Sequence, residues 1–206
     1  TGIKLANHSL TVLAQGGDGD GYGEGGNHFL HAMRRNINIT YLVHNNQVYG
    51  LTKGQTSPTS DCGFVTNTTP RGASSPACNP LLLAVASECS FVARGFAGEI
   101  DHLAGLIKAG IQHQGFALFD ILQPCVSFNR VNTFKWYSDR VYQIGDDSAY
   151  DASDRLKAIE KAGEWGDKIP IGLLYRTQRP TLEDQIPALA DRPLVAQQDD
   201  PQVFSE

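Results

Sequence analysis

Short apolar runs alternate with amphipathic stretches along most of this chain. Runs rich in branched and aromatic residues predict buried strands at residues 10–14, 37–44, 91–93, 116–122 and 169–175. Helical spacing of apolar positions predicts helices at residues 24–35, 80–87, 99–113 and 152–162. Because strands and helices alternate, we expect a three-layer α/β fold in which a mainly parallel sheet is covered on both faces.

Polar side chains follow the first two predicted strands. The first strand leads into a glycine-dense turn that carries Asp18 and Asp20, and the second ends at Asn45 and Asn46. Loops that follow parallel strands lie at one edge of the sheet, so Asp18 and Asn46 are expected to face the same crevice. A carboxylate, an amide oxygen, a backbone carbonyl and phosphate oxygens together suit Mg²⁺. The pattern therefore predicts a magnesium ion that holds a diphosphate.

The glycine-dense turn also permits close approach to an anion. Glycines leave the backbone free of side chains, and a helix that begins near Glu24 would direct its unpaired N–H groups at the same diphosphate. A calcium-binding loop is less favoured, because Phe29 stands where a bidentate Glu is required. The segment from Gly21 to Gly26 matches the dinucleotide pattern G-x-G-x-x-G, but residues 27–60 contain no acid that could hold a ribose.

Four segments carry a resemblance to a known family. Gly17-Asp18-Gly19, followed after 25 residues by Asn45-Asn46, resembles the thiamin-diphosphate motif. Residues 48–60, VYGLTKGQTSPTS, resemble more specifically the β subunit of 2-oxoacid:ferredoxin oxidoreductases, in particular the 2-oxoglutarate-type or short two-subunit enzymes. Residues 90–103 and 115–129 resemble the same subunit in the same order, so the likeness covers roughly residues 1–175.

The resemblance implies a thiamin-diphosphate-binding fold and an oxidative decarboxylation. The expected reaction converts a 2-oxoacid, 2-oxoglutarate or pyruvate, into its coenzyme A thioester, with electrons passing through an iron–sulfur cluster to ferredoxin. A partner α subunit is expected to carry the acid that activates the aminopyrimidine of the cofactor. Two alternatives stay open, namely a non-oxidative thiamin-dependent decarboxylase or synthase and a catalytically silent cofactor-binding fragment.

The family motif also assigns roles to individual residues. Asp18 and Asn46 are expected to bind Mg²⁺ through their side chains and Val48 through its carbonyl, while Asn45 fixes the turn. Asp20 is expected either at the thiazolium side or as a cap of the following helix. Lys53 is a candidate for binding a substrate carboxylate or coenzyme A phosphates, or else is a solvated surface lysine. The complete set predicted to bind the cofactor is Gly17, Asp18, Gly19, Asp20, Asn46, Val48, Tyr49, Gly50 and Leu51.

Cys125 resembles the fourth thiolate ligand of a [4Fe–4S] cluster. The chain does not begin with Met, and its first residues resemble the middle of the family's β subunit, so we expect that an N-terminal part with the other three ligands is missing. A free buried thiol is the alternative for Cys125. The other cysteines, Cys62, Cys78 and Cys89, show no metal-binding spacing. Reduced thiols in a cytoplasmic protein are the simpler interpretation.

Composition limits the remaining possibilities. With 206 residues, 41% of them hydrophobic and 19% charged, the chain is typical of one soluble globular unit. A net charge of −5 and the lack of a basic stripe argue against nucleic acid as a partner. No apolar run approaches the ~20 residues that would cross a membrane. We expect a thiamin-diphosphate domain at 1–130, a C-terminal extension at 131–175, and an arm or disordered tail at 176–206.

Overall fold

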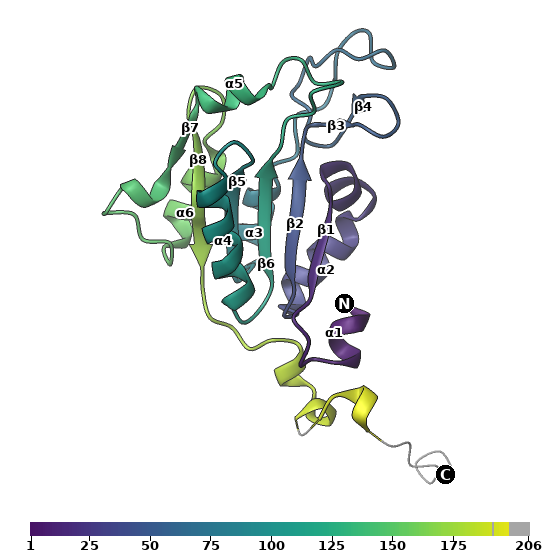
Figure 1. The fold of residues 1–206 in the computed structure, drawn as a ribbon, viewed down its shortest axis with the longest axis vertical. Coiled ribbons are helices and arrows are strands. Elements are labelled where there is room, and N and C mark those ends of the chain that lie inside the picture. Colours follow the sequence, from purple (N-terminus) through teal and green to yellow (C-terminus); the bar gives the residue numbers. More distant parts are fainter. Residues whose placement is uncertain (191, 198–206) are drawn as a thin grey trace.

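A six-stranded, mainly parallel sheet forms the centre of the computed structural model, which describes residues 1–190 and 192–197 (Figure 1). Adjacent strands pair in parallel, except that the last long strand runs antiparallel to its neighbour β5. The predicted mainly parallel sheet is therefore confirmed. In spatial order, the strands are β1 (Leu13–Gly17), β2 (Thr40–Asn45), β6 (Ala117–Leu122), β5 (Phe91–Phe96), β8 (Ile169–Arg176) and β7 (Val141–Gln143).

Helices cover both faces of the sheet, which makes the fold three-layered as predicted. Helix α4 (Ile100–Gln112) lies on one face, in front of the sheet in Figure 1, and packs Leu103, Leu106 and Ile107 against β5 and β6. The main apolar cluster on the other face draws on α2 (Gly26–Arg35), α3 (Pro80–Ala86) and α6 (Arg155–Gly163). The short helices α1 (Gly2–Ala6) and α5 (Phe134–Ser138) lie outside these layers.

Side-chain caps explain where two of the helices begin. The Asn79 side chain accepts hydrogen bonds from the backbone N–H groups of Leu81 and Leu82, and Pro80 occupies the first helical position of α3. The Asn79 amide also donates to the Ala162 carbonyl at 2.8 Å, which ties α3 to the end of α6. Asp154 caps α6 in the same manner.

The region around the glycine-dense turn departs from the predicted boundaries. The first strand is shifted to Leu13–Gly17 because Gly16 and Gly17, which are poor strand formers, are held by parallel pairing with β2. The predicted helix at 24–35 is preceded by one π-helical turn, Gly19–Glu24, in which the Gly25 N–H donates to the Asp20 carbonyl at 2.7 Å. The chain therefore follows a different path after β1 from the one that a regular α-helix would give.

Residues 48–79 form a long connection above β2 in Figure 1. It contains one small hairpin, β3 (Val48–Tyr49) paired with β4 (Gln55–Thr56). The hairpin turn holds Lys53 at φ +79° and Gly54 at φ +95°. A left-handed conformation is unusual for a lysine and concentrates strain at the hairpin tip.

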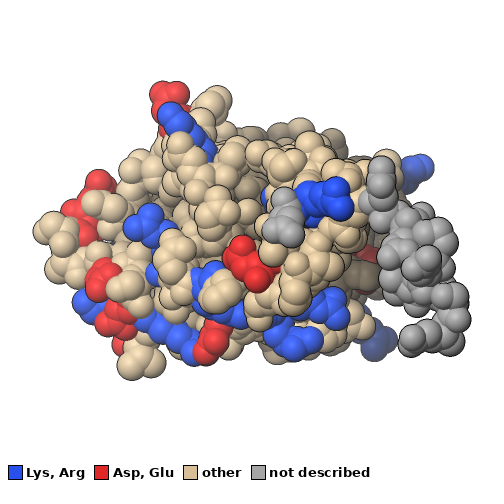
Figure 2. All heavy atoms as spheres, turned by 90° about the horizontal axis from the view of Figure 1, so that it is seen from below, with Lys and Arg blue, Asp and Glu red and all other residues tan. Residues whose placement is uncertain are grey.

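Residues after β8 run to the opposite end of the sheet, which the view in Figure 2 faces. There the Thr177 N–H donates to the Ser90 carbonyl at 2.9 Å, and the Asn36 amide donates to the Arg179 carbonyl at 3.1 Å. Buried Glu183 accepts from the Asn38 N–H at 3.2 Å. Lys and Arg side chains lie beside Asp and Glu on this face (Figure 2). Residues 191 and 198–206 of the predicted tail lie outside the described residues.

The described part of the chain includes three 3₁₀ turns near its end, Glu183–Gln185, Pro187–Leu189 and Leu194–Ala196, and another at Ile144–Asp146. The residues predicted as a C-terminal extension, 131–175, supply β7 and most of β8 to the same sheet. Within the described residues, no helix is both long enough and apolar enough to cross a membrane.

Candidate functional site

The ends of β1 and β2 bring Asp18 and Asn46 together. These strands pair in parallel with Gly17 opposite His44, so the residues that follow each strand lie at the same edge. The Asn46 N–H donates a hydrogen bond to Asp18 Oδ1, with the two atoms 3.4 Å apart. The two residues that were paired from the sequence are therefore direct neighbours.

Asp18 is a buried carboxylate, with only 1% of its surface exposed. Its Oδ2 accepts hydrogen bonds from the Ser57 hydroxyl at 2.5 Å and from the Thr59 hydroxyl at 2.6 Å. Burial raises the pKa of Asp18 above its ordinary value, although the bonds from Ser57 and Thr59 act in the opposite direction. Among the described residues, no Lys, Arg or His lies within ion-pair distance of Asp18. A bound cation would supply that missing charge.

Asn46 is held by a sharp bend of the main chain. Gln47 has φ +60°, and this bend lets the Val48 N–H donate to Asn46 Oδ1 at 3.0 Å. From a different loop, the Asn129 amide donates to the Asn46 carbonyl at 3.2 Å. The orientation of Asn46 is thus fixed from both sides before any ligand is bound.

The donor set at this edge suits a hard cation whose coordination is completed by a ligand. Nowhere in the described chain do three or more His, Cys, Asp or Glu side chains group as a metal site. A metal at Asp18 would therefore need neutral oxygens, such as the Asn46 amide and the Val48 carbonyl, together with phosphate oxygens. Mg²⁺ commonly binds through one or two carboxylates plus substrate phosphates. The long contact at Asp18 Oδ1 leaves that oxygen available to such an ion.

Aromatic rings pack directly against the glycines of the turn. A Cβ atom on Gly19 would lie 2.2 Å from the Tyr49 ring, and one on Gly21 would lie 2.4 Å from the Tyr41 hydroxyl. The Tyr49 hydroxyl in turn donates to Glu24 at 3.1 Å. These glycines are therefore required by internal packing. The turn and the β3–β4 hairpin form one packed unit.

Asp20 closes the turn instead of capping α2. Its Oδ2 accepts a hydrogen bond from the Gly17 N–H at 2.9 Å, and its side chain is exposed. No hydrogen bond caps the start of α2 through a side chain.

The hairpin tip projects two of the predicted residues, Leu51 and Lys53, into solvent. Leu51 is fully exposed, and Lys53 is exposed beside it. A Cβ on Gly50 would lie 3.8 Å from Cys125 Sγ, so the predicted cluster ligand is next to the hairpin. The Cys125 side chain is half-buried.

A second, deeper group of polar residues was not among the residues predicted from the sequence. Asp120 and Arg94 are 1% and 2% exposed, and Arg94 Nε lies 3.5 Å from Asp120 Oδ2. The Asn45 amide donates to Asp120 Oδ1 at 2.9 Å, and the Tyr22 hydroxyl donates to the same atom at 3.1 Å. The signal for both charged residues was present, since each interrupts an apolar strand, SFVARGF or FALFDIL.

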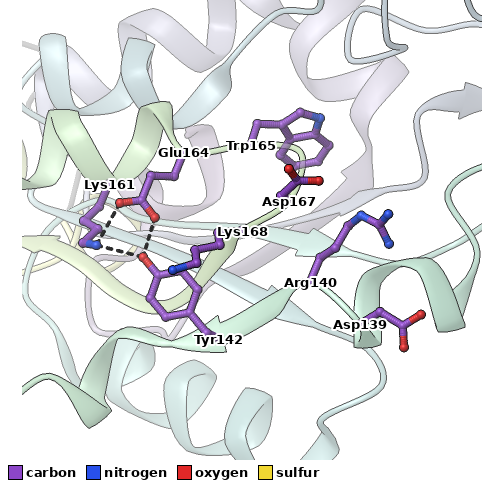
Figure 3. A pocket seen from close by; sticks show the side chains of 8 residues that line it. All are labelled: Asp139, Arg140, Tyr142, Lys161, Glu164, Trp165, Asp167 and Lys168. Carbon is purple, nitrogen blue, oxygen red and sulfur yellow. Dashed lines mark hydrogen bonds and ion pairs between the residues drawn. The ribbon is translucent and has the colours of Figure 1, made fainter.

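Two hollows lie beside this group. A cavity of about 180 Å³ is lined by Arg94, Asp120 and Trp165 among others. A more open pocket of about 770 Å³ lies on the outer side of Trp165 (Figure 3). In that pocket the Lys161 ammonium donates to Tyr142 and Glu164, each at 2.8 Å, and these hydrogen bonds raise the pKa of Lys161. None of the predicted site residues lines the open pocket.

Comparisons with known proteins identify the family of this chain. Residues 1–121 match the family described as thiamine pyrophosphate enzyme, C-terminal TPP binding domain. Residues 125–191 match the family described as the C-terminal part of the pyruvate ferredoxin oxidoreductase beta chain. The first of these matches covers more than half of the chain and places it in the class of thiamine pyrophosphate enzyme domains.

Individual relatives narrow this class. The 2-oxoacid:ferredoxin oxidoreductase subunit beta of Saccharolobus solfataricus is 44% identical, over 93% of this chain and 68% of that protein. The subunit beta of 2-oxoacid:ferredoxin oxidoreductase 1 of Aeropyrum pernix is 47% identical, over 85% of this chain and 58% of that protein. A solved 2-oxoglutarate:ferredoxin oxidoreductase from Magnetococcus marinus superimposes with a TM-score of 0.86 at 42% identity, over 89% of this chain and 62% of that one.

The chain belongs to the family of 2-oxoacid:ferredoxin oxidoreductase β subunits. The family and the fold predicted from the sequence are thus confirmed. The chain spans about two thirds of the length of these relatives.

Proposed function

We propose that this chain anchors thiamin diphosphate through Mg²⁺, as the β subunit of an oxidoreductase that converts a 2-oxoacid to its coenzyme A thioester. The observation that carries the proposal is the buried Asp18 carboxylate, which has no cationic partner among the described residues and touches Asn46 at the same sheet edge. Membership of the thiamin-pyrophosphate-binding family supports it.

Each residue at the sheet edge has a distinct part in this proposal. Asp18, the Asn46 amide and the Val48 carbonyl bind the metal, while Ser57 and Thr59 hold the carboxylate in place. The backbone of Gly17, Gly19 and Asp20 and the hairpin residues Tyr49, Gly50 and Leu51 lie beside the diphosphate. Bound thiamin diphosphate would supply the electron sink for decarboxylation of the 2-oxoacid.

The names and ligands of the relatives support the proposed substrates and partners. The Magnetococcus marinus enzyme was solved with 2-oxoglutarate, coenzyme A and succinyl-CoA bound. For this chain we therefore propose 2-oxoglutarate or pyruvate as substrate, coenzyme A as acyl acceptor and ferredoxin as electron acceptor. Exposed Lys53 would attract a carboxylate or phosphate of these substrates. An α subunit would complete the site, and the cytoplasm is the proposed location.

An iron–sulfur cluster would require ligands from beyond this chain. Half-buried Cys125 is the proposed fourth thiolate ligand, and its closeness to Gly50 of the proposed cofactor site supports this role. Because no three or more His, Cys, Asp or Glu side chains group as a metal site in the described residues, the other three thiolates would come from outside these residues. Iron analysis and visible absorption of the assembled enzyme distinguish this proposal from a non-oxidative thiamin enzyme, which needs no iron.

The metal anchor can be tested by binding alone. We expect thiamin diphosphate to bind the assembled enzyme only with Mg²⁺ present, and Asp18→Asn to weaken this binding by at least tenfold. Asp101→Asn, an exposed carboxylate on α4, is the matched control and should bind as the unmutated enzyme does. Binding that is independent of both Mg²⁺ and Asp18 would refute the anchor.

The reaction requires a separate assay. With coenzyme A, a 2-oxoacid and the α subunit present, we expect reduction of a redox dye that depends on all three. Absence of dye reduction in an enzyme that binds the cofactor and contains iron would favour the silent binding module.

A further inference from the structure

Asp120 lies at the centre of a buried polar group that the proposed cofactor site does not itself use. It stands in the middle of β6, where Val43 of β2 and Arg94 of β5 flank it in register. Its Oδ1 accepts from the Asn45 amide and the Tyr22 hydroxyl, while its Oδ2 faces Arg94 Nε. A carboxylate so far from solvent normally requires partners, and Asp120 has two hydrogen-bond donors at Oδ1 and an ion-pair partner at Oδ2.

From Asp120 a continuous path of polar atoms leads to Asp18. Asn45 directs its amide nitrogen to Asp120, and its Oδ1 lies 2.9 Å from the Thr59 hydroxyl. The Thr59 oxygen lies 2.6 Å from Asp18 Oδ2. All four residues of this path are buried.

Asp120 determines the orientation of the Asn45 side-chain amide. An ionised carboxylate can only accept hydrogen bonds, so Asn45 must present its NH₂ group to Asp120. The Asn45 oxygen is then turned towards Thr59. The Thr59 hydroxyl has a single proton, which it shares between Asp18 Oδ2 and Asn45 Oδ1, so it couples the position of one oxygen to the position of the other.

The Arg94–Asp120 pair is poorly arranged for stability alone. Within the described residues, Arg94 Nε and Nη1 have no hydrogen-bond acceptor. Buried ion pairs with incomplete hydrogen bonding are often no more stabilising than apolar residues of similar size. The Asp120 carboxylate of this pair does, however, hold the Asn45 side chain, and Asn45 directly precedes Asn46, a proposed metal ligand.

We infer that Asp120 is a positioning residue for the metal end of the cofactor site, acting through Asn45 and Thr59 on the orientation of the Asp18 carboxylate. The inference rests on the proposed function, because it assumes a cation at Asp18. Hydrogen-bonded partners of metal ligands commonly change metal affinity by about 10–100-fold when mutated.

A matched pair of variants isolates the hydrogen bond from the buried charge. Both carry Arg94→Met, which removes the cation, and they differ only in Asp120→Asn or Asp120→Leu. Asn keeps an oxygen that can accept from Asn45, whereas Leu, of similar size, does not. The Leu variant should need about 10–100 times more Mg²⁺ than the Asn variant for half-maximal thiamin diphosphate binding, measured by calorimetry on the assembled enzyme.

A comparison of Mg²⁺ with Ca²⁺ distinguishes a loss of Asp18 positioning from a general loosening of the metal site. Mg²⁺ demands nearly ideal octahedral geometry, whereas Ca²⁺ tolerates irregular sites. If Asp120 positions Asp18, the Leu variant loses more affinity for Mg²⁺ than for Ca²⁺. Should that variant not fold, Thr59→Val breaks the same path by exchanging a hydroxyl for a methyl and should show the same preferential loss of Mg²⁺.

Ser90→Ala is the control for a purely structural effect. Ser90 is buried immediately before β5, and it hydrogen-bonds Asn36 at the opposite end of the sheet. This variant should lower the denaturation midpoint and leave the Mg²⁺ requirement unchanged. Equal Mg²⁺ requirements in the matched pair, or parallel losses for Mg²⁺ and Ca²⁺, overturn the inference and leave the proposed function standing. Metal-independent binding by the unmutated enzyme overturns both.

Discussion

Gly19→Ala should be the most informative small change in the glycine-dense turn. The added Cβ would lie 2.2, 2.6 and 2.8 Å from three atoms of the Tyr49 ring. Since carbon atoms pack at about 3.5–4.0 Å, the ring must move by roughly 1.3 Å or more. That movement would break the hydrogen bond from Tyr49 to Glu24 and displace β3, which contains Val48.

The expected cost of Gly19→Ala follows from this overlap. Adding one carbon to a packed site typically costs about 1–3 kcal/mol. For a chain of this size each kcal/mol lowers the melting temperature by about 2–4 °C, so we expect a decrease of roughly 2–12 °C. Thermal denaturation followed by circular dichroism measures this decrease, and urea titration gives the free energy of unfolding.

Two further variants test whether the Tyr49 ring is the cause. Tyr49→Ala removes the obstructing atoms, so the double variant should recover most of the loss, with a coupling free energy above about 0.5 kcal/mol. Gly26→Ala is the control, because its Cβ would meet nothing within 4 Å at the first position of α2. It should be neutral or stabilising by up to about 1 kcal/mol. A Gly19→Ala variant as stable as Gly26→Ala would refute the reasoning.

Three other predictions concern separate parts of the molecule. Asn79→Ala should destabilise the chain by about 1–2 kcal/mol in urea denaturation, because α3 loses its cap and its hydrogen bond to the Ala162 carbonyl, whereas Asn79→Asp keeps the cap, cannot donate to Ala162 and should recover only part of the stability. Burial, and secondarily Arg176, lowers the pKa of His113 below its ordinary 6.5, so its neutral form stabilises the fold above that pH and this contribution is lost as the pH falls below it. His113→Gln should therefore flatten the decrease in unfolding free energy between pH 7 and pH 5, and an unchanged slope would contradict the assignment. Lys53→Gln should raise the KM for the 2-oxoacid or coenzyme A severalfold without changing Mg²⁺-dependent cofactor binding, and steady-state kinetics that show no change would leave Lys53 a surface lysine.

The meeting of Asp18 with Asn46 could be predicted because a general rule of parallel sheets determines it. Each residue follows its own strand, and parallel neighbours end at the same edge. The helix spacing of α4 and the Asn-Pro start of α3 were equally local signals. Local pattern and the rule for parallel strands were therefore sufficient for the fold class and for the approach of Asp18 to Asn46.

The surroundings of Asp18 depend on contacts that no local pattern encodes. Ser57 and Thr59 reach the carboxylate from 39 and 41 residues away in a connection without periodic spacing. The path of such a connection is set by tertiary packing. Asp120 could have been identified from the sequence as a candidate residue, because a lone charged residue in an apolar strand predicts a buried partner. The sequence does not say which residue that partner is.

Because β8 runs antiparallel to β5, the residues that follow it lie far from the proposed metal ligands. Because this strand runs against its neighbour, it delivers residue 177 and its successors to the rim of the sheet farthest from the hairpin (Figure 1). Proteins attached after residue 190 would start at that distant rim and should leave thiamin diphosphate binding at the proposed metal ligands undisturbed.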